Sequence, residues 1–331
     1  MARIAFGPHA TTGARTHEEE WFFSCLRVFV AAYNARMQRR EFLAAVAAAG
    51  AAAAHPDALD AAQASQKVQR KGRLKQALFR QVFGQTTMTF DEQCRLAADL
   101  GCVGFDLIGP QDWPTMKKYG LVPTMAGAGP VTFPDGLIHK EIHDQLEPKM
   151  KAFIDQCVEG GCSKIITVGG QRKGMSYAEG ADNAVAFFNR IKSYAEGKRV
   201  TICLENMNSR YPDNVLGRPD QICDHVGWGF EVCKRVNSPS VKMLFDIYHA
   251  QIMDGNVCDT IKDNLQWIAH FHTAGVPWRH ELDDTQELNY RFVAKTIVEL
   301  GFTGYIAHEY RPTPGKDPME VLRRTLDLMD V

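Results

Sequence analysis

The chain has 331 residues, of which 45% are hydrophobic and 23% are charged, a balance typical of globular proteins with one large domain or two smaller ones. The formal net charge is −1 at pH 7, so no basic surface is indicated and nucleic acid is not expected as a partner. The nine cysteines form no CxxC pair and their number is odd, which argues against a disulfide framework.

The N-terminal part has the pattern of a bacterial twin-arginine export signal. Arg39 and Arg40 directly precede an Ala-rich apolar run that ends at Ala54, and Ala62-Gln-Ala64 fits a small-residue cleavage site. The run is shorter than the roughly 20 residues that cross a bilayer, so no membrane span is expected. The alternative is a chance Ala-rich helix in a cytoplasmic protein. We predict an exported, periplasmic protein with an upstream extension of unknown role (1–36), a signal peptide (37–64) and a linker (65–73).

From residue 74 onward, apolar runs typical of strands alternate with segments of helical spacing. The first unit is a strand predicted over 74–83 and a helix predicted over 89–100, which Thr89 and Glu92 begin with a capping box. Seven further strands are predicted, at 103–108, 121–125, 164–168, 200–205, 241–246, 268–273 and 303–309. The helices that follow them are predicted at 110–119, 139–159, 176–196, 218–236, 256–267, 289–300 and 317–329.

Eight strand–helix units in about 260 residues match the size and order of a (β/α)₈ TIM barrel. We therefore predict one α/β catalytic domain over 74–331. A doubly wound open sheet is the competing architecture, but it needs fewer units or a second domain, and no break in composition marks one. No Gly-x-Gly-x-x-Gly follows the first strand, so the sequence does not indicate a dinucleotide cofactor.

Polar side chains stand at the carboxyl ends of the last four predicted strands: Glu205, Asp246, His272 and Glu309. Neighbouring strand ends of a closed barrel meet at one mouth, where three carboxylates repel each other strongly without a cation. We predict that these four residues bind one divalent metal ion, Mn²⁺, Mg²⁺, Co²⁺ or Zn²⁺. Taken singly, each residue is more often a salt-bridge partner, a cap or a solvated charge. Their coincidence on four consecutive strands favours the metal.

Three further residues are candidates for binding a substrate. His249 lies one turn beyond the sixth strand, where it can reach a substrate oxygen. Arg279 lies in the loop after the seventh strand, where a guanidinium can bind a carboxylate bidentately. The alternative for Arg279 is a surface salt bridge with Glu281 or Asp283. Asn206 directly follows the fifth strand and can either orient the neighbouring carboxylate or bind substrate.

At these positions the chain resembles the xylose isomerase-like TIM barrel superfamily, and most of all its hydroxypyruvate isomerase family. The barrel pattern covers roughly residues 74–330. There are two departures. The best-known isomerase branch carries Gln where this chain has His272, whereas the related ketose 3-epimerase branch carries His, and the predicted export signal differs from the cytoplasmic location expected of a hydroxypyruvate isomerase. The matching runs are Leu204-Glu-Asn206, Phe245-Asp-Ile-Tyr-His249, Ile268-Ala-His270, Arg279-His-Glu281, Glu287-Leu-Asn-Tyr290 and Glu309-Tyr-Arg-Pro312.

The resemblance implies that the four strand-end residues bind the metal, that Glu205 and Glu309 also transfer the proton, and that His249 and Arg279 bind substrate. The expected reaction is isomerisation of a small α-hydroxy carbonyl compound through an enediolate, of the type that converts hydroxypyruvate to tartronate semialdehyde. The alternatives are a ketose 3-epimerase, a lyase that dehydrates an inosose-type ketone, and a non-enzymatic binding protein for a sugar acid. A homo-oligomer is compatible with this reading.

Overall fold

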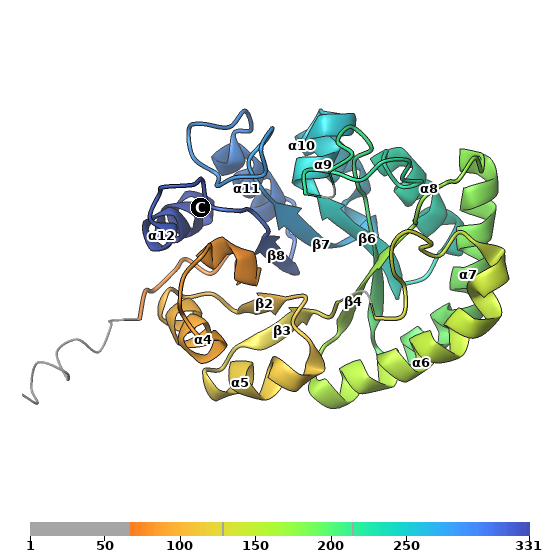
Figure 1. Cartoon of the computed structure of the whole chain (residues 1–331), viewed down its shortest axis with the longest axis horizontal. Helices are drawn as coiled ribbons and strands as arrows, with labels where there is room; N and C mark the ends of the chain where they lie inside the picture. The colour runs from red at the N-terminus through yellow and green to blue at the C-terminus, as the bar shows by residue number, and fades with distance from the viewer. Residues whose placement is uncertain (1–66, 128, 214) are drawn as a thin grey trace, which may run out of the picture. The chain divides into compact units, whose positions relative to one another are not determined.

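The computed structural model describes residues 67–127, 129–213 and 215–331 (Figure 1). The predicted extension (1–36) and export signal (37–64) lie outside the described residues. The described part of the predicted linker packs on the barrel: Arg70 Nε donates to the Leu100 carbonyl at 2.7 Å, and the Lys71 N–H donates to Asp330 at 2.9 Å. Within these ranges, no helix has the length and apolar character needed to span a bilayer.

Eight parallel strands form one sheet, in the order β3-β2-β1-β8-β7-β6-β5-β4. The two ends of this order meet at Ala126, whose N–H donates to the Lys164 carbonyl at 2.8 Å and whose carbonyl accepts from the Ile166 N–H at 3.2 Å. The sheet therefore forms a nearly closed barrel, which confirms the predicted (β/α)₈ fold. The strands are β1 (Lys75–Leu78), β2 (Gly104–Asp106), β3 (Val122–Met125), β4 (Lys164–Val168), β5 (Thr201–Glu205), β6 (Val241–Asp246), β7 (Ile268–Thr273) and β8 (Tyr305–His308).

The helices lie outside the strands (Figure 1). The predicted capping box is present: the Thr89 N–H donates to Glu92 Oε2 at 2.7 Å, and the Glu92 N–H donates to Thr89 Oγ1 at 3.3 Å. The helices are α4 (Phe90–Asp99), α5 (Trp113–Lys118), α6 (His143–Gly160), α7 (Tyr177–Lys198), α8 (Val226–Val236), α9 (Ile247–Met253), α10 (Val257–Asn264), α11 (Tyr290–Glu299) and α12 (Pro318–Met329). Short 3₁₀ helices occur at Arg80–Phe83, Pro110–Asp112, Lys140–Ile142 and Leu265–Trp267.

Two predicted elements are wrong in extent. The first strand, predicted over 74–83, ends at Leu78, where the chain turns into a 3₁₀ helix. Val82 and Phe83 of this helix are also buried, so the apolar run in the sequence is longer than the strand. The helix predicted over 218–236 begins only at Val226. The residues before Val226 are instead hydrogen-bonded to the loop after β4: the Ile222 N–H donates to the Gly170 carbonyl at 3.0 Å. The other predicted elements are present, with ends that differ by one or two residues when the 3₁₀ helices are counted.

The inside of the barrel is divided between apolar and polar side chains. A small apolar cluster of Met125, Ile166, Cys203 and Leu244 fills the part enclosed by β3 to β6. β2 and β7 instead contribute the buried polar side chains of Asp106, His270 and His272. Buried polar groups of this kind need hydrogen-bond partners. Asp106 accepts from both imidazoles, whereas His270 Nδ1 has no partner among the described residues.

Candidate active site

The structure brings the four predicted metal-binding residues together. Glu205 and Asp246 are the last residues of β5 and β6, His272 lies near the end of β7, and Glu309 directly follows β8. One ligand atom from each residue, three carboxylate oxygens and one ring nitrogen, lie within 4.8 Å of one another. Oxygen and imidazole ligands suit Mg²⁺, Mn²⁺, Co²⁺ or Zn²⁺, so this donor set fits one divalent cation.

The cluster carries concentrated negative charge. Burial raises the pKa of Asp246 to about 7, and the neighbouring carboxylates add to this rise. Burial also raises the pKa of Glu309, but Arg279 and His272 outweigh it and bring that pKa down to about 2. Three carboxylates at one point exceed the charge that one guanidinium and one imidazole can offset. A bound cation would relieve this repulsion.

His272 faces the cluster with its Nδ1 atom. This nitrogen lies 3.2 Å from Glu205 Oε1 and 3.0 Å from Glu309 Oε2. Burial lowers the pKa of His272, but hydrogen bonds to Asp106, Glu205 and Glu309 reverse this and hold its pKa well above the usual value. The ring therefore points at the place where the carboxylates converge.

Arg279 reaches into the site from the loop after β7. Its Nη2 atom lies 2.7 Å from Glu309 Oε1 and 3.6 Å from Asp246 Oδ2. The surface salt bridge considered as its alternative is not formed, because Glu281 and Asp283 both pair with Lys316 instead, at 2.6 Å each. The guanidinium therefore belongs to the barrel mouth.

His249 is placed by α9, a helix that the sequence analysis missed. The Asp246 carboxylate caps this helix by accepting the Tyr248 N–H at 2.8 Å, so the chain turns from strand to helix without a loop. His249 Nε2 lies 3.4 Å from Asp246 Oδ2 and 3.3 Å from Arg279 Nη1. Burial lowers its pKa well below the usual value, and Arg279 lowers it further. The short length of α9 hides any helical periodicity.

Asn206 is fully buried and ties β5 to β6. Its Nδ2 donates to the Asp246 carbonyl at 3.0 Å, and its Oδ1 accepts from the Asp246 N–H at 2.9 Å. These hydrogen bonds go to the Asp246 backbone, so they fix the end of β6 beside β5 rather than the carboxylate of Glu205.

Sequence reasoning missed Asp106 and His270. Asp106 Oδ2 accepts from Nε2 of His270 at 2.7 Å and from Nε2 of His272 at 3.0 Å, and its other oxygen accepts from the Thr124 hydroxyl. Burial raises the pKa of Asp106, but the two imidazoles outweigh this and lower it strongly. Asp106 ends β2, so it follows the same strand-end rule as the four clustered residues. The predicted strand ran two residues past it, which concealed that position.

A cavity of about 240 Å³ adjoins the cluster at the barrel mouth. Glu205 and Glu309 form part of its wall, and three arginines, Arg218, Arg279 and Arg311, form another part. Its apolar wall is built from Leu107, Phe133, Ile166, Val168, Met207 and Val215. The size suits a small molecule, and the guanidinium groups suit an anionic one.

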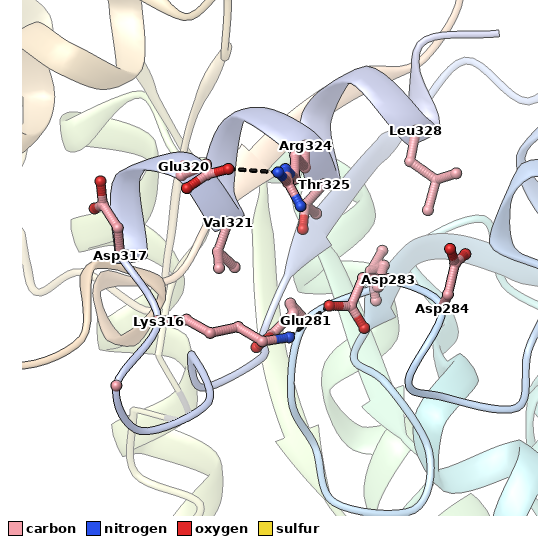
Figure 2. A pocket seen from close by; sticks show the side chains of 12 residues that line it. Glu281, Asp283, Asp284, Lys316, Asp317, Glu320, Val321, Arg324, Thr325 and Leu328 are labelled. Carbon is pink, nitrogen blue, oxygen red and sulfur yellow. Dashed lines mark hydrogen bonds and ion pairs between the residues drawn. The ribbon is translucent and has the colours of Figure 1, made fainter. Parts of the chain in front are cut away.

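A larger hollow of about 510 Å³ lies elsewhere, between the loop after β7 and α12 (Figure 2). Lys316 extends between Glu281 and Asp283, and Arg324 pairs with Glu320 at 2.5 Å. Its charged side chains thus pair largely with each other, and none of the four clustered residues lines it. Of the two, only the smaller cavity at the barrel mouth is lined by clustered residues, namely Glu205 and Glu309.

The sequence matches one protein family over most of its length. The model of the family described as xylose isomerase-like TIM barrel matches residues 94–330. The 2-oxo-tetronate isomerase of Cupriavidus necator is 38% identical over 122 residues, 37% of this chain and 44% of the relative. A provisionally named hydroxypyruvate isomerase of Danio rerio is 40% identical over 111 residues, 33% of this chain and 38% of the relative. The chain thus spans less than half of the length of these two relatives.

A relative that matches more of the chain has a lower sequence identity. The 2-oxo-tetronate isomerase of Pectobacterium atrosepticum is 25% identical over 242 residues, 69% of this chain and 88% of the relative. Among solved structures, an AP endonuclease of family 2 from Brucella melitensis has a TM-score of 0.65 at 24% identity, covering 74% of this chain and 95% of its own. D-psicose 3-epimerase with D-fructose has a TM-score of 0.59 at 15% identity, covering 78% and 94%. These structures share the barrel fold with this chain.

Proposed function

The chain belongs to the xylose isomerase-like TIM barrel family, and from this premise we propose that it is a metal-dependent isomerase of a small α-hydroxy carbonyl compound. The reaction would be of the type that interconverts hydroxypyruvate and tartronate semialdehyde. The observation that carries this proposal is the convergence of Glu205, Asp246, His272 and Glu309 within 4.8 Å. The names of the relatives, hydroxypyruvate isomerase and 2-oxo-tetronate isomerase, support it.

These four residues would hold one divalent cation, Mn²⁺, Mg²⁺, Co²⁺ or Zn²⁺. When bound, such an ion polarises a carbonyl and makes the neighbouring C–H more acidic. Glu205 and Glu309 belong to β5 and to the end of β8, and β6 and β7 separate these strands in the sheet. The two carboxylates therefore approach the cluster from different sides. One would remove the α-proton, and the same or the other carboxylate would return it to the neighbouring carbon.

The cavity wall indicates the charge of the substrate. Arg279 lies 2.7 Å from Glu309, and Arg218 and Arg311 line the same cavity. A guanidinium forms paired hydrogen bonds with a carboxylate, which neutral sugars lack. The substrate is therefore a hydroxy-carbonyl acid in this proposal, held by Arg279 and by the Nε2 side of His249.

A ketose 3-epimerase is the second candidate. It is favoured by His272, because an imidazole at this position matches the epimerase branch of the family. Two carboxylates on different sides of a substrate also suit removal and return of a proton on opposite faces. Isomerase and epimerase share the first proton transfer and differ in the carbon that receives the proton.

Deuterium exchange at the α-carbon tests the proposal. The full chain would be incubated in D₂O with Mg²⁺ or with EDTA and followed by NMR, using hydroxypyruvate, other hydroxy-carbonyl acids, small ketoses and inososes. We expect metal-dependent exchange, fastest with an acid. Glu309→Gln should abolish the exchange, whereas Glu299→Gln, an exposed glutamate at the end of α11, should leave it unchanged. Absence of exchange with every compound, while Mg²⁺ is shown to bind, would contradict the proposal.

A further inference from the structure

His249 has a buried contact that the proposed function does not use. The Nε2 side of its ring faces the site, 3.4 Å from Asp246 Oδ2. The Nδ1 side points to the loop after β5, where Asn208 Nδ2 lies 2.6 Å away. Both His249 and Asn208 are fully buried. This short contact therefore determines which ring nitrogen carries a proton.

The orientation of the Asn208 amide is fixed by two backbone groups. Its Nδ2 also donates to the Leu216 carbonyl at 2.7 Å, and its Oδ1 accepts from the Tyr211 N–H at 3.3 Å. Turning the amide over would bring two oxygens together at Leu216 and two N–H groups together at Tyr211. Nδ2 of Asn208, and not its oxygen, therefore faces His249.

An N–H group opposite Nδ1 requires a lone pair on Nδ1. The proton of the His249 ring then resides on Nε2, since a proton on Nδ1 would set two donors against each other at 2.6 Å. Nε2–H points to the side of Asp246, into the site. Arg279 Nη1 lies 3.3 Å from Nε2 and can only donate; with the proton on Nε2, this longer contact gives no hydrogen bond and contributes only charge.

We infer that Asn208 is a positioning residue that fixes His249 as its Nε2–H tautomer, so that the ring presents a hydrogen-bond donor to the substrate. The identity of the acceptor, an oxygen of a hydroxy-carbonyl acid, rests on the proposed function. A fixed donor at this place binds a carbonyl or carboxylate oxygen and gives no acceptor for an ammonium or hydroxyl proton. The loop after β5 thereby takes part in selecting the substrate without touching it.

The tautomer can be observed directly. The full chain labelled with [¹⁵N]histidine would be recorded in two-bond ¹H–¹⁵N correlation spectra, without metal and with Mg²⁺, and the His249 signal identified by its loss in His249→Gln. We expect a lone pair on Nδ1 in the wild-type protein. In Asn208→Asp we expect a proton on Nδ1, because a carboxylate oxygen accepts where the amide donated. Ser209→Ala is the matched control, since its hydroxyl in the same loop contacts the Gln221 N–H at 2.9 Å.

The outcomes separate this inference from the proposed function. A proton on Nδ1 in the wild-type protein, or an unprotonated Nδ1 in a folded Asn208→Asp variant, overturns the inference. The wild-type spectrum decides the matter even where the variant does not fold. With the acid that exchanges fastest, Asn208→Asp should raise KM at least about tenfold with a smaller change in kcat, and Ser209→Ala should stay within about twofold. If no compound exchanges but Nδ1 is unprotonated, the proposed function fails and the inference stands.

Discussion

At the residue scale, Asp106 determines how His272 presents its ring. Because Asp106 accepts a hydrogen bond from Nε2 at 3.0 Å, the Nδ1 atom is left to face Glu205 and Glu309. Carboxylates behind ligating histidines hold the ring orientation and raise its basicity, and losing one costs about 10- to 100-fold in metal affinity. Asp106 thus supports the cluster from the opposite side of the imidazole.

We predict that Asp106→Asn weakens Mn²⁺ binding about 10- to 100-fold, because it removes the charge behind His272. Binding would be measured by electron paramagnetic resonance of free Mn²⁺. Asp263→Asn, an exposed aspartate of α10, is the control and should bind like the wild type. In a His272→Gln background the same Asp106→Asn change should have little effect. An equal loss in both backgrounds would show that Asp106 does not act through His272.

Single residues also show what the sequence could and could not predict. Glu205, Asp246, His272 and Glu309 were identifiable because strand ends of a barrel meet at one mouth, so spacing along the chain was enough. Asn208 and His270 were not identifiable, because their partners lie 41 and 164 residues away along the chain. Hydrogen bonds of that kind depend on side-chain direction, which no local pattern encodes.

At the scale of elements, caps were predictable and tertiary backbone contacts were not. The α4 capping box follows from Thr89 and Glu92 alone. The late start of α8 depends on hydrogen bonds from the preceding segment to the loop after β4, which override its helical spacing. Similarly, the first strand was predicted too long, because the buried apolar run continues beyond β1 into the 3₁₀ helix at Arg80–Phe83. In both segments the hydrophobic pattern predicts which residues are buried, but it does not predict the backbone conformation.

Loss of the α4 cap should destabilise the barrel modestly. Thr89→Ala removes both hydrogen bonds of the hydroxyl and is expected to lower the free energy of unfolding by about 1 kcal/mol. Urea unfolding followed by circular dichroism would measure it. Thr87→Ala, an exposed threonine before the helix, is the control and should change the free energy by less than about 0.5 kcal/mol.

The loop after β7 is joined to the chain after β8 by an ion pair with a defined pH dependence. Burial raises the pKa of Glu281, but Lys316 and backbone N–H groups outweigh it, so the pKa lies below its usual value. A carboxylate with a lowered pKa stabilises the folded state above the unfolded pKa of about 4.3, and this contribution is lost as pH falls below it. Glu281 is 2% exposed, so solvent screens the pair weakly.

Glu281→Gln should therefore lower the free energy of unfolding relative to wild type between pH 5 and pH 7, by a constant amount, and the difference should shrink below about pH 4. Urea unfolding at a series of pH values would measure this difference. Asp284→Asn, an exposed neighbour in the same loop, should show no such trend. A difference that persists unchanged at low pH would contradict the role assigned to the carboxylate.

At the scale of the whole molecule, the sequence predicted the number and order of strands but not how the sheet closes. Eight alternating units are sufficient to indicate a barrel. The closure depends on Ala126, which follows β3 and pairs with β4 through one bridge. The four clustered residues all come from the other side, from β5 to the end of β8. The clustered residues thus lie on the continuously paired side of the barrel, opposite the single bridge between β3 and β4.

A metal bound by four strands should stabilise the whole barrel. At a free Mg²⁺ concentration 100 times its dissociation constant, we expect the free energy of unfolding to rise by about 2.7 kcal/mol. Thermal unfolding with Mg²⁺ and with EDTA would detect this gain as a higher Tm. Glu309→Gln should lose most of it, and Glu299→Gln should keep it. A Tm that is independent of Mg²⁺ in every variant would argue against the metal site.

The narrow closure at Ala126 also has a consequence for motion. A sheet held by one bridge between β3 and β4 has a seam, and amide hydrogens at a seam exchange with water sooner than those inside continuous ladders. Ile166 on β4 and Phe133 after β3 line the cavity on this side. Local opening at this seam would widen the cavity there, while the four clustered residues at β5 to β8 keep their places in the continuous part of the sheet. The side of the barrel at β3 and β4 is thus held by fewer backbone hydrogen bonds than the side from β5 to β8, which carries the four clustered residues.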